Sequence, residues 1–367
     1  MVNVISIGAN PTPIWGMSNK DRTQKIARAA DAENGNDQDA GVILANDEFV
    51  LDPLLLSFVR SRGPVILKRE GVPVLAKVND SRQREDIEAA MQGGPAFADP
   101  SVETIDIDDE FTLYNRKLRK RVRPTVVRLE PGSVRKIERD TYFGAYKGVT
   151  DILTKYLWPE WALVLTRLAA RFGISPNQVT AIGLLFCVAA TILFWFGQYW
   201  LGMASGLVFM VLDTVDGKLA RCTITSSKMG SRFDHRIDLI HPPFWWLAWL
   251  HGLAAWGLKL SPEATLITAL VLVLGYVVDR VVERRFIKGN GFHIHVWKKL
   301  DSDFRLIGAR RNPNMVILFV AMLFGRPDIG IVAVAAWTVI SLLFHAVRAV
   351  QANRRRAGGE TLSSWLD

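Results

Sequence analysis

The sequence predicts a membrane all-α six-helix bundle with an N-terminal cytoplasmic α/β domain. Apolar segments of membrane-spanning length begin only after residue 175, and short strands alternate with amphipathic helices before that point. A chain of 367 residues with 49% hydrophobic residues and 12 Trp has room for both parts. The net charge of +9 comes from basic residues beside the apolar segments, which favours anionic membrane lipids over nucleic acid as partners.

The first domain is expected to span residues 1–130. Its expected elements are strands at 2–8, 41–45, 65–68 and 72–78 and helices at 19–32, 52–60 and 81–92. Asn19 is the expected cap of the first helix, the last helix is expected to begin at Ser81, and Gly71 lies between two paired strands. Alternating strands and helices are typical of a small layered α/β structure.

A linker and amphipathic helices are expected at residues 131–174, after a basic run at 116–124. The membrane domain follows at 175–350, and a cytoplasmic tail occupies 351–367. The predicted spans are 176–197, 199–216, 237–257, 262–282, 313–325 and 328–348, of which the fifth is short.

Charge asymmetry predicts the orientation of these spans. Lys and Arg crowd the connections at 218–232 and 280–311 and the segment that follows the last span, whereas the alternate connections are short and nearly uncharged. The positive-inside rule then places both termini on the cytoplasmic side of the inner membrane. The first residues lack the basic region and apolar core of a signal peptide, which agrees with a cytoplasmic N-terminus.

Four carboxylates lie where two predicted spans meet their cytoplasmic connection: Asp213, Asp216, Asp234 and Asp238. Acidic side chains are costly beside the hydrocarbon core, so a functional site is the default interpretation. At about 100° per residue, the first two share one helical face, and the last two lie one turn apart on a second helix. Two such helices can converge hard oxygen ligands on Mg²⁺ or Mn²⁺.

Small residues accompany these carboxylates. Gly217 and Ala220 share the face of the first two aspartates, so a ligand or another helix can approach the backbone there. Arg221 adds a fixed cation suited to phosphate oxygens. Together these residues describe a holder for a metal-bound diphosphate. The alternative, in which the aspartates only pair with nearby Lys and Arg, accounts less well for a pattern with so many fixed positions.

The pattern D-x-x-D-G-x-x-A-R, followed after eight residues by G-x-x-x-D-x-x-x-D, resembles the signature of the CDP-alcohol phosphotransferases, and the resemblance covers roughly residues 140–350. It implies metal-dependent transfer of a substituted phosphate from a CDP-alcohol, such as CDP-diacylglycerol, to a hydroxyl acceptor with release of CMP. It also implies that all four aspartates hold the metal centre, that Asp238 is the catalytic base, and that the protein can form a homodimer.

The same resemblance assigns the CDP-alcohol side to a set of residues from three segments. These are Asn177, Thr180, Gly217, Arg221 and Ser227. His235, beside Asp234, departs from the common members and leaves the acceptor open as a small polar alcohol, phosphorylated or not. Arg310 and Arg311 are further candidates for acceptor binding, with ordinary inside-positive charge as the alternative.

The N-terminal domain resembles a degenerate sugar-nucleotidyltransferase, on the opening strand and the segments at 13–20 and 42–55. The glycine-rich G-x-G-T-R loop that would cradle CTP phosphates is absent, and Gly8-Ala-Asn-Pro-Thr-Pro13 stands in its place. We therefore expect a regulatory or docking domain. The alternative is a bifunctional enzyme that also makes its own CDP-polyol.

Two interpretations from other classes are disfavoured. A cation transporter would place its acids near the membrane midplane and often show repeated halves, but these acids lie at span ends and no repeat is visible. An inactive membrane scaffold has no need for the intact motif. The histidines show no zinc-binding pattern: His241 and His251 are expected to pack helices, and His293 and His295 lie in a loop.

Overall fold

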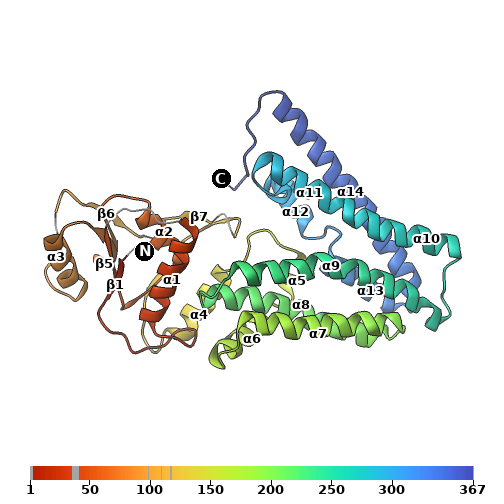
Figure 1. Cartoon of the computed structure of the whole chain (residues 1–367), viewed down its shortest axis with the longest axis horizontal. Helices are drawn as coiled ribbons and strands as arrows, with labels where there is room; N and C mark the ends of the chain where they lie inside the picture. The colour runs from red at the N-terminus through yellow and green to blue at the C-terminus, as the bar shows by residue number, and fades with distance from the viewer. Residues whose placement is uncertain (1–2, 35–40, 98, 109, 116–117, 367) are drawn as a thin grey trace. The chain divides into compact units, whose positions relative to one another are not determined.

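The computed structural model describes residues 3–34, 41–97, 99–108, 110–115 and 118–366. The chain forms two compact units. The first comprises Met1–Tyr146, Arg167–Ile174 and Lys218–Ser226, and the second comprises Lys147–Thr166, Ser175–Gly217 and Ser227–Asp367. Strands occur in the first unit and long helices in the second, as the ribbon in Figure 1 shows.

A five-stranded mixed sheet forms the centre of the first unit, with the strand order β1-β2-β5-β4-β6. Its strands are β1 (Asn3–Ile7), β2 (Val42–Asn46), β4 (Val65–Arg69), β5 (Val72–Val78) and β6 (Glu103–Asp106). The pairs β1–β2 and β4–β6 are parallel, and β5 is antiparallel to both of its neighbours. Two small ribbons pair β3 (Phe49–Leu51) with β9 (Val126–Arg128) and β7 (Leu113–Asn115) with β8 (Lys120–Val122).

Helices cover both faces of this sheet. On one face α1 (Asn19–Asn34) and α2 (Pro53–Arg60) bury Ile26 and Leu55 against strand residues such as Ile43. On the other, α3 (Ser81–Met91) buries Ile87 against Leu44, the next residue along the same strand. Alternation along the strands thus divides the core between two layers, and the predicted α/β layering is confirmed (Figure 1).

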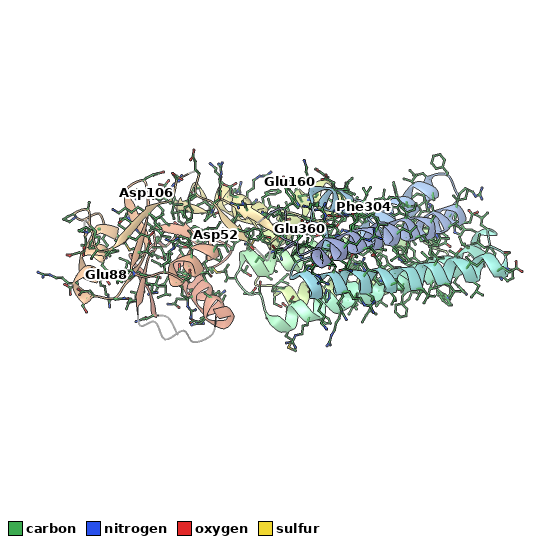
Figure 2. The ribbon with its side chains drawn as sticks, turned by 90° about the horizontal axis from the view of Figure 1, so that it is seen from above. Asp52, Glu88, Asp106, Glu160, Phe304 and Glu360 are labelled. Atoms are coloured by element: carbon green, nitrogen blue, oxygen red, sulfur yellow. The ribbon has the colours of Figure 1, made fainter. Side chains whose placement is uncertain are left out.

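The helix starts show one wrong prediction. Asn19 does not cap α1, because its side chain donates hydrogen bonds to the carbonyls of Asp47 and Phe49, whereas the Ser18 hydroxyl accepts from the amide of Asp21. Asp52, labelled in Figure 2, caps α2 by accepting from the Leu54 amide. The helix predicted to begin at Ser81 does begin there.

The remainder of the chain is almost entirely helical. The α-helices are α4 (Val134–Gly144), α5 (Ile152–Tyr156), α6 (Pro159–Arg171), α7 (Pro176–Trp195), α8 (Tyr199–Cys222), α9 (Lys228–Gly252), α10 (Pro262–Leu270), α11 (Tyr276–Asn290), α12 (Lys299–Arg305), α13 (Arg311–Leu323) and α14 (Pro327–Ala357). Short 3-10 turns occupy η1 (Leu253–Trp256) and η3 (Ile294–Val296).

Four of these helical runs are long and apolar enough to cross a membrane, among the residues the structure describes. They are Pro176–Trp195, Tyr199–Cys222, Pro262–Asn290 and Pro327–Ala357. Helix α13 is apolar but shorter than these four runs. Helix α9 is long enough, but its first third is charged, so the helix as a whole is less apolar than these runs. A mostly helical C-terminal region with apolar helices of membrane-spanning length is therefore confirmed, and the count of six crossings stays a prediction.

A π-helical turn, η2 (Val271–Gly275), joins α10 and α11 into one continuous run. At this turn the run packs on α14, and a Cβ on Gly275 would lie 3.0 Å from a methyl carbon of Thr338. Hydrogen bonds from residue i to i+5 accommodate an extra residue in the wider turn. The polar residues Asp279 and Glu283 follow directly on α11.

Candidate active site

Helices α7, α8 and α9 pack closely through glycines. A Cβ on Gly206 of α8 would lie 3.0 Å from the ring of Trp245 on α9. A Cβ on Gly230, at the start of α9, would lie 2.6 Å from Oδ1 of Asn177 at the start of α7. Two long helices thus begin side by side at the end that carries the aspartates.

Three of the four predicted ligands converge. Asp213 and Asp216 on α8 and Asp234 on α9 each offer a carboxylate oxygen, and these oxygens all lie within 4.8 Å of one another. The Thr180 hydroxyl on α7 donates to Oδ2 of Asp216 at 2.5 Å, which orients that buried carboxylate. The helical spacing in the sequence therefore predicted a real cluster.

The charge of this cluster fits a divalent cation. Burial, followed by the charges of Asp213 and Asp216, raises the pKa of Asp234 to about 9, at a position before the predicted span 237–257. Carboxylate oxygens are the ligands that Mg²⁺ and Mn²⁺ prefer, and a cation among them relieves their mutual repulsion.

The fourth aspartate has a different partner. Asp238 is outside the three-carboxylate group, and its Oδ1 accepts from Nη1 of Arg311 at 2.9 Å. The same guanidinium donates through Nη2 to Oδ2 of Asp213 at 2.6 Å. Arg311, predicted as an acceptor-binding residue, therefore bridges two of the predicted metal ligands.

The residues predicted for the CDP side have mixed surroundings. Thr180 contacts the cluster from α7, and Asn177 lies beside Gly230 at the start of α9. Ser227 caps α9 by accepting from the Gly230 amide at 2.9 Å. Gly217 directly follows Asp216. Arg221 belongs to the segment Lys218–Ser226, which clusters with the first unit. Their joint binding of one nucleotide stays a prediction.

The other two predicted acceptor residues have their contacts elsewhere in the part of the chain that the structure describes. His235 is exposed on α9. Arg310 donates to both carboxylate oxygens of Glu283, at 2.6 and 2.7 Å, and its Nη2 lies 3.1 Å from Nε2 of His295. The acceptor roles of His235 and Arg310 stay predictions.

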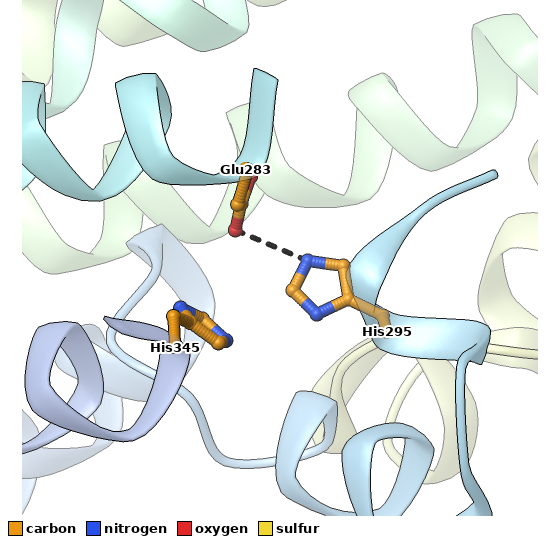
Figure 3. Close-up of side chains that lie close together, drawn as sticks. All are labelled: Glu283, His295 and His345. Carbon is orange, nitrogen blue, oxygen red and sulfur yellow. Dashed lines mark ion pairs between the residues drawn. The ribbon is translucent and has the colours of Figure 1, made fainter. Parts of the chain in front are cut away.

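A buried group that the sequence did not indicate lies beside Arg310. Glu283 on α11, His295 in η3 and His345 on α14 lie together, as Figure 3 shows. His345 bonds Oδ1 of Asp279 through Nδ1 at 2.6 Å. No local motif could reveal this group, because its members come from three elements and α14, which carries His345, lies well beyond the other two in the sequence. The sequence places His295 in a loop but does not indicate its partners.

In the N-terminal loop that replaces the glycine-rich motif, two backbone amides already donate hydrogen bonds within the protein. The amide of Asn10 donates to Oδ2 of Asp47 at 3.0 Å, and the amide of Thr12 donates to Oδ1 of Asn10 at 3.0 Å. The neighbouring Pro11 and Pro13 have no amide N–H to offer. The loop therefore has few backbone donors left for phosphate.

Comparison with known proteins identifies the family of this chain. Residues 173–341 match the model of the CDP-alcohol phosphatidyltransferases. The archaetidylinositol phosphate synthase of Pyrococcus horikoshii is 31% identical over 189 residues, covering 50% of this chain and 88% of that protein. Cholinephosphotransferase 1 of Gallus gallus is 32% identical over 127 residues, covering 32% of this chain and 36% of that protein.

Among solved structures, the phosphatidylinositol phosphate synthase of Mycobacterium tuberculosis, in complex with manganese and citrate, is 19% identical with a TM-score of 0.41; the match covers 51% of this chain and 88% of that one. The signature in the sequence and the relative matched over 88% of its length indicate the same family. The chain is a transferase that belongs to the CDP-alcohol phosphatidyltransferase family.

Proposed function

We propose that this protein transfers a phosphatidyl-type group from CDP-diacylglycerol to a hydroxyl of a phosphorylated polyol and releases CMP, as a step of phospholipid biosynthesis. The convergence of Asp213, Asp216 and Asp234 carries the proposal, because three carboxylates this close together need a cation. The relative matched over 88% of its length is named for an inositol phosphate product, whereas the choline enzyme is matched over 36%. That contrast favours a phosphorylated polyol over choline as acceptor.

In this mechanism Asp213, Asp216, Asp234 and Asp238 would hold Mg²⁺ or Mn²⁺, the first three through oxygens that lie within 4.8 Å of one another. Thr180 keeps Asp216 oriented. The bound cation would polarise the phosphoryl oxygens and stabilise the charge that develops on departing CMP. Asn177, Gly217, Arg221 and Ser227 line the CDP side, and His235 and Arg310 lie toward the acceptor. Rigid helices supply the positioning on which phosphoryl transfer depends.

Asp238 acts as the base. Arg311 engages its Oδ1, and its side chain is 42% exposed against 17% for Asp213, so Asp238 is the carboxylate that an acceptor can reach. It takes the proton of the acceptor hydroxyl while that oxygen bonds to the phosphorus of the phosphatidyl group. The bond from this phosphorus to the CMP oxygen breaks, and the electron pair leaves with CMP.

We further propose that residues 175–350 form the catalytic membrane domain, with the aspartates and both termini on the cytoplasmic side. Residues 1–130 form a cytoplasmic domain without cytidylyltransferase activity, supported by the occupied loop around Asn10. Residues 131–174 connect the two as a linker with amphipathic helices, and residues 351–367 are a cytoplasmic tail.

The test is CMP release by the purified protein from CDP-diacylglycerol with a panel of polyols and polyol phosphates. Asp213→Asn and Asp216→Asn should reduce release to background while the protein still inserts, and chelation should do the same until Mg²⁺ or Mn²⁺ is restored. Asp328→Asn, which alters an aspartate paired with Arg326 elsewhere, is the matched control. Near-normal release by either site variant, or no release with any acceptor, contradicts the proposal.

A further inference from the structure

We propose that Lys218 is a positioning residue of the transfer reaction, through which the N-terminal domain acts on the end of α8. The inference rests on the proposed function, because Asp216 and Arg221, on the same helix, belong to the site proposed above. Helix α8 runs from the second unit into the first, and residues 218–226 cluster with the first unit. Within that segment, Ile224 packs against the core of the N-terminal domain. The contacts of Lys218 described next therefore lie within one unit.

The side chain of Lys218 lies against two aromatic rings of α4. Lys218 is only 2% exposed, and its Nζ lies 2.7 Å from the ring centre of Tyr146 and 5.1 Å from that of Tyr142. The two tyrosine hydroxyls share a hydrogen bond of 3.0 Å, and their ring planes are inclined by 77°. An ammonium group is attracted to the face of an aromatic ring, and the attraction is stronger away from water. The tyrosine pair thus fixes the place of this side chain.

A packing role alone does not require a lysine at this position. Burying an ammonium group is costly unless its charge is compensated, and an apolar side chain of similar length would fill the same space. The ring faces supply compensation as long as α4 keeps them over the ammonium. Lys218 comes two residues after Asp216 and three before Arg221. Because residues three apart lie on one side of a helix, a shift of Lys218 also moves Arg221.

Helix α4 is held in turn by Trp15 of the N-terminal domain. The indole N–H of Trp15 donates to Oγ1 of Thr141 at 3.0 Å, and its amide donates to Oε1 of Glu138 at 3.2 Å. Trp15 is buried, and Thr141 directly precedes Tyr142. The N-terminal domain therefore contacts α4 immediately beside the tyrosine pair.

The turn at residues 14–17 has an unusual backbone that supports this docking. Its two ends exchange backbone hydrogen bonds of 2.9 and 3.1 Å, with Trp15 and Gly16 between them at φ of 51° and 73°. Glycine adopts a positive φ freely, but a bulky residue does so rarely, and its surroundings must offset the strain. The bonds of Trp15 to α4 supply that offset. A Cβ on Gly16 would lie 2.9 Å from the carbonyl oxygen of Ala170, so the turn also packs closely on the end of α6.

Glu138 joins the same turn to α6. Its Oε1 accepts from the Trp15 amide, and its Oε2 accepts from Nε of Arg167 at 3.0 Å. Arg167 also donates through Nη2 to the carbonyl of Arg135 on α4 at 2.6 Å. Residues 167–174 belong to the first unit, as α4 does. The contacts thus run without a break from the N-terminal domain through α4 to Lys218, and a displacement of α4 should reach the end of α8.

The experiment measures KM for CDP-diacylglycerol and kcat for CMP release on the full-length protein. Tyr146→Leu, which loses the aromatic face, should raise KM several-fold with a smaller change in kcat, because Asp216 keeps its bond to Thr180. Tyr146→Phe keeps the ring and should stay near the native values. Lys218→Met should raise KM as well, and adding Tyr146→Leu to it should change little more, because the two residues act through one contact.

Trp15→Phe tests the link to the N-terminal domain. It loses the indole N–H bond to Thr141 and should raise KM in the same direction as Tyr146→Leu. The matched control is Tyr156→Leu, which alters an exposed tyrosine 5.1 Å from Nζ of Lys155 and should leave KM unchanged. A native KM in Trp15→Phe would remove the N-terminal domain from the inference.

Amide hydrogen exchange of residues 218–226, followed by mass spectrometry, adds a readout that needs no turnover. Exchange should be faster in Tyr146→Leu and Trp15→Phe than in the native protein or Tyr146→Phe. Equal KM and equal exchange in the leucine and phenylalanine variants would overturn the inference, as would an additive effect of Tyr146→Leu in Lys218→Met protein. Failure of the proposed function would look different, because the native protein would release no CMP while the differences in exchange persist.

Discussion

At the residue scale, the aspartates of the site have unequal roles because their neighbours differ. Asp213 is shared between the three-carboxylate group and Arg311, and Asp216 is buried and oriented by Thr180. Among the four aspartates, Asp238 combines an arginine contact with a half-exposed side chain. Chemically identical side chains are thus distinguished by what lies within hydrogen-bond distance of each.

Asp238→Asn should lower turnover more than it weakens binding of the CDP-lipid. The amide keeps the size of the side chain but cannot take a proton, and loss of a general base costs about 100-fold or more in rate. Measurement of CMP release and of CDP-diacylglycerol binding on the same preparation separates the two effects. Asp328→Asn is the control, and a loss of binding equal to that of Asp213→Asn would make Asp238 mainly a metal ligand.

Gly230→Ala should impair the site without removing any functional group. The new Cβ would lie 2.6 Å from Oδ1 of Asn177 and 3.0 Å from the Ser227 hydroxyl oxygen, so these two side chains, or the helix starts that carry them, must shift. Such overpacking typically costs about 1–3 kcal/mol. We expect a lower unfolding temperature and several-fold slower CMP release. Gly144→Ala, where the added Cβ meets nothing within 4 Å, should change neither quantity, and equal behaviour of the two variants would refute this explanation.

At the element scale, the segment at residues 309–312, where α13 begins, shows what sequence patterns cannot reveal. The carboxylate cluster was predictable because helical spacing places Asp213 and Asp216 on one face, and the strand pair around Gly71 was predictable from its local pattern. Arg311 lies 98 residues from Asp213 and 73 from Asp238, and no local signal links them. The sequence shows the positive charge of Arg311, but the carboxylates that it contacts depend on the tertiary packing of three helices.

The buried group around His295 predicts a pH dependence of stability. Because burial holds the pKa of His295 well below 6.5, the folded protein keeps it neutral, whereas the unfolded chain takes up a proton there. Stability should therefore be fully present above pH 6.5 and fall as the pH drops below it, by up to about 1.4 kcal/mol per pH unit. The groups that face His295 are Glu283, Arg310, Arg305 and His345.

Thermal unfolding in detergent, followed on both sides of pH 6.5, measures this effect. His295→Gln should flatten the decline, because its side chain does not titrate. His251→Gln, at an exposed position, should leave the decline unchanged. A decline that is equally steep without His295 would assign the acid sensitivity to other groups.

At the scale of the whole molecule, the chain joins a sheet-containing unit to a helical one. The layered α/β domain and the late start of the apolar helices were predictable from alternation and segment length. The small ribbons formed by β3 with β9 and by β7 with β8 were not, because strands of three residues carry almost no periodic signal. The number of crossings was also hard to predict, since α9 mixes a charged start with an apolar end.

The full-length protein should not release pyrophosphate from CTP with any sugar or polyol phosphate. The amides of Asn10 and Thr12 are already bonded within the domain, so a triphosphate lacks its usual backbone donors. Pyrophosphate detection on the full chain, and on Asp238→Asn to exclude the transferase site, checks this expectation. Metal-dependent release by both proteins would favour the bifunctional alternative, with a catalytic loop within residues 8–20.

The π turn at Val271–Gly275 also determines the rotational phase of α11. A turn with hydrogen bonds from i to i+5 absorbs one extra residue, so the flanking helices keep the phase of a run one residue shorter. Deleting one residue inside this turn should leave Asp279 facing His345 and Glu283 facing Arg310, whereas one deletion between Asp279 and Glu283 turns the latter by about 100°. Insertions and deletions in this helix should thus differ sharply in effect over a few positions, and the tolerant ones lie in the π turn.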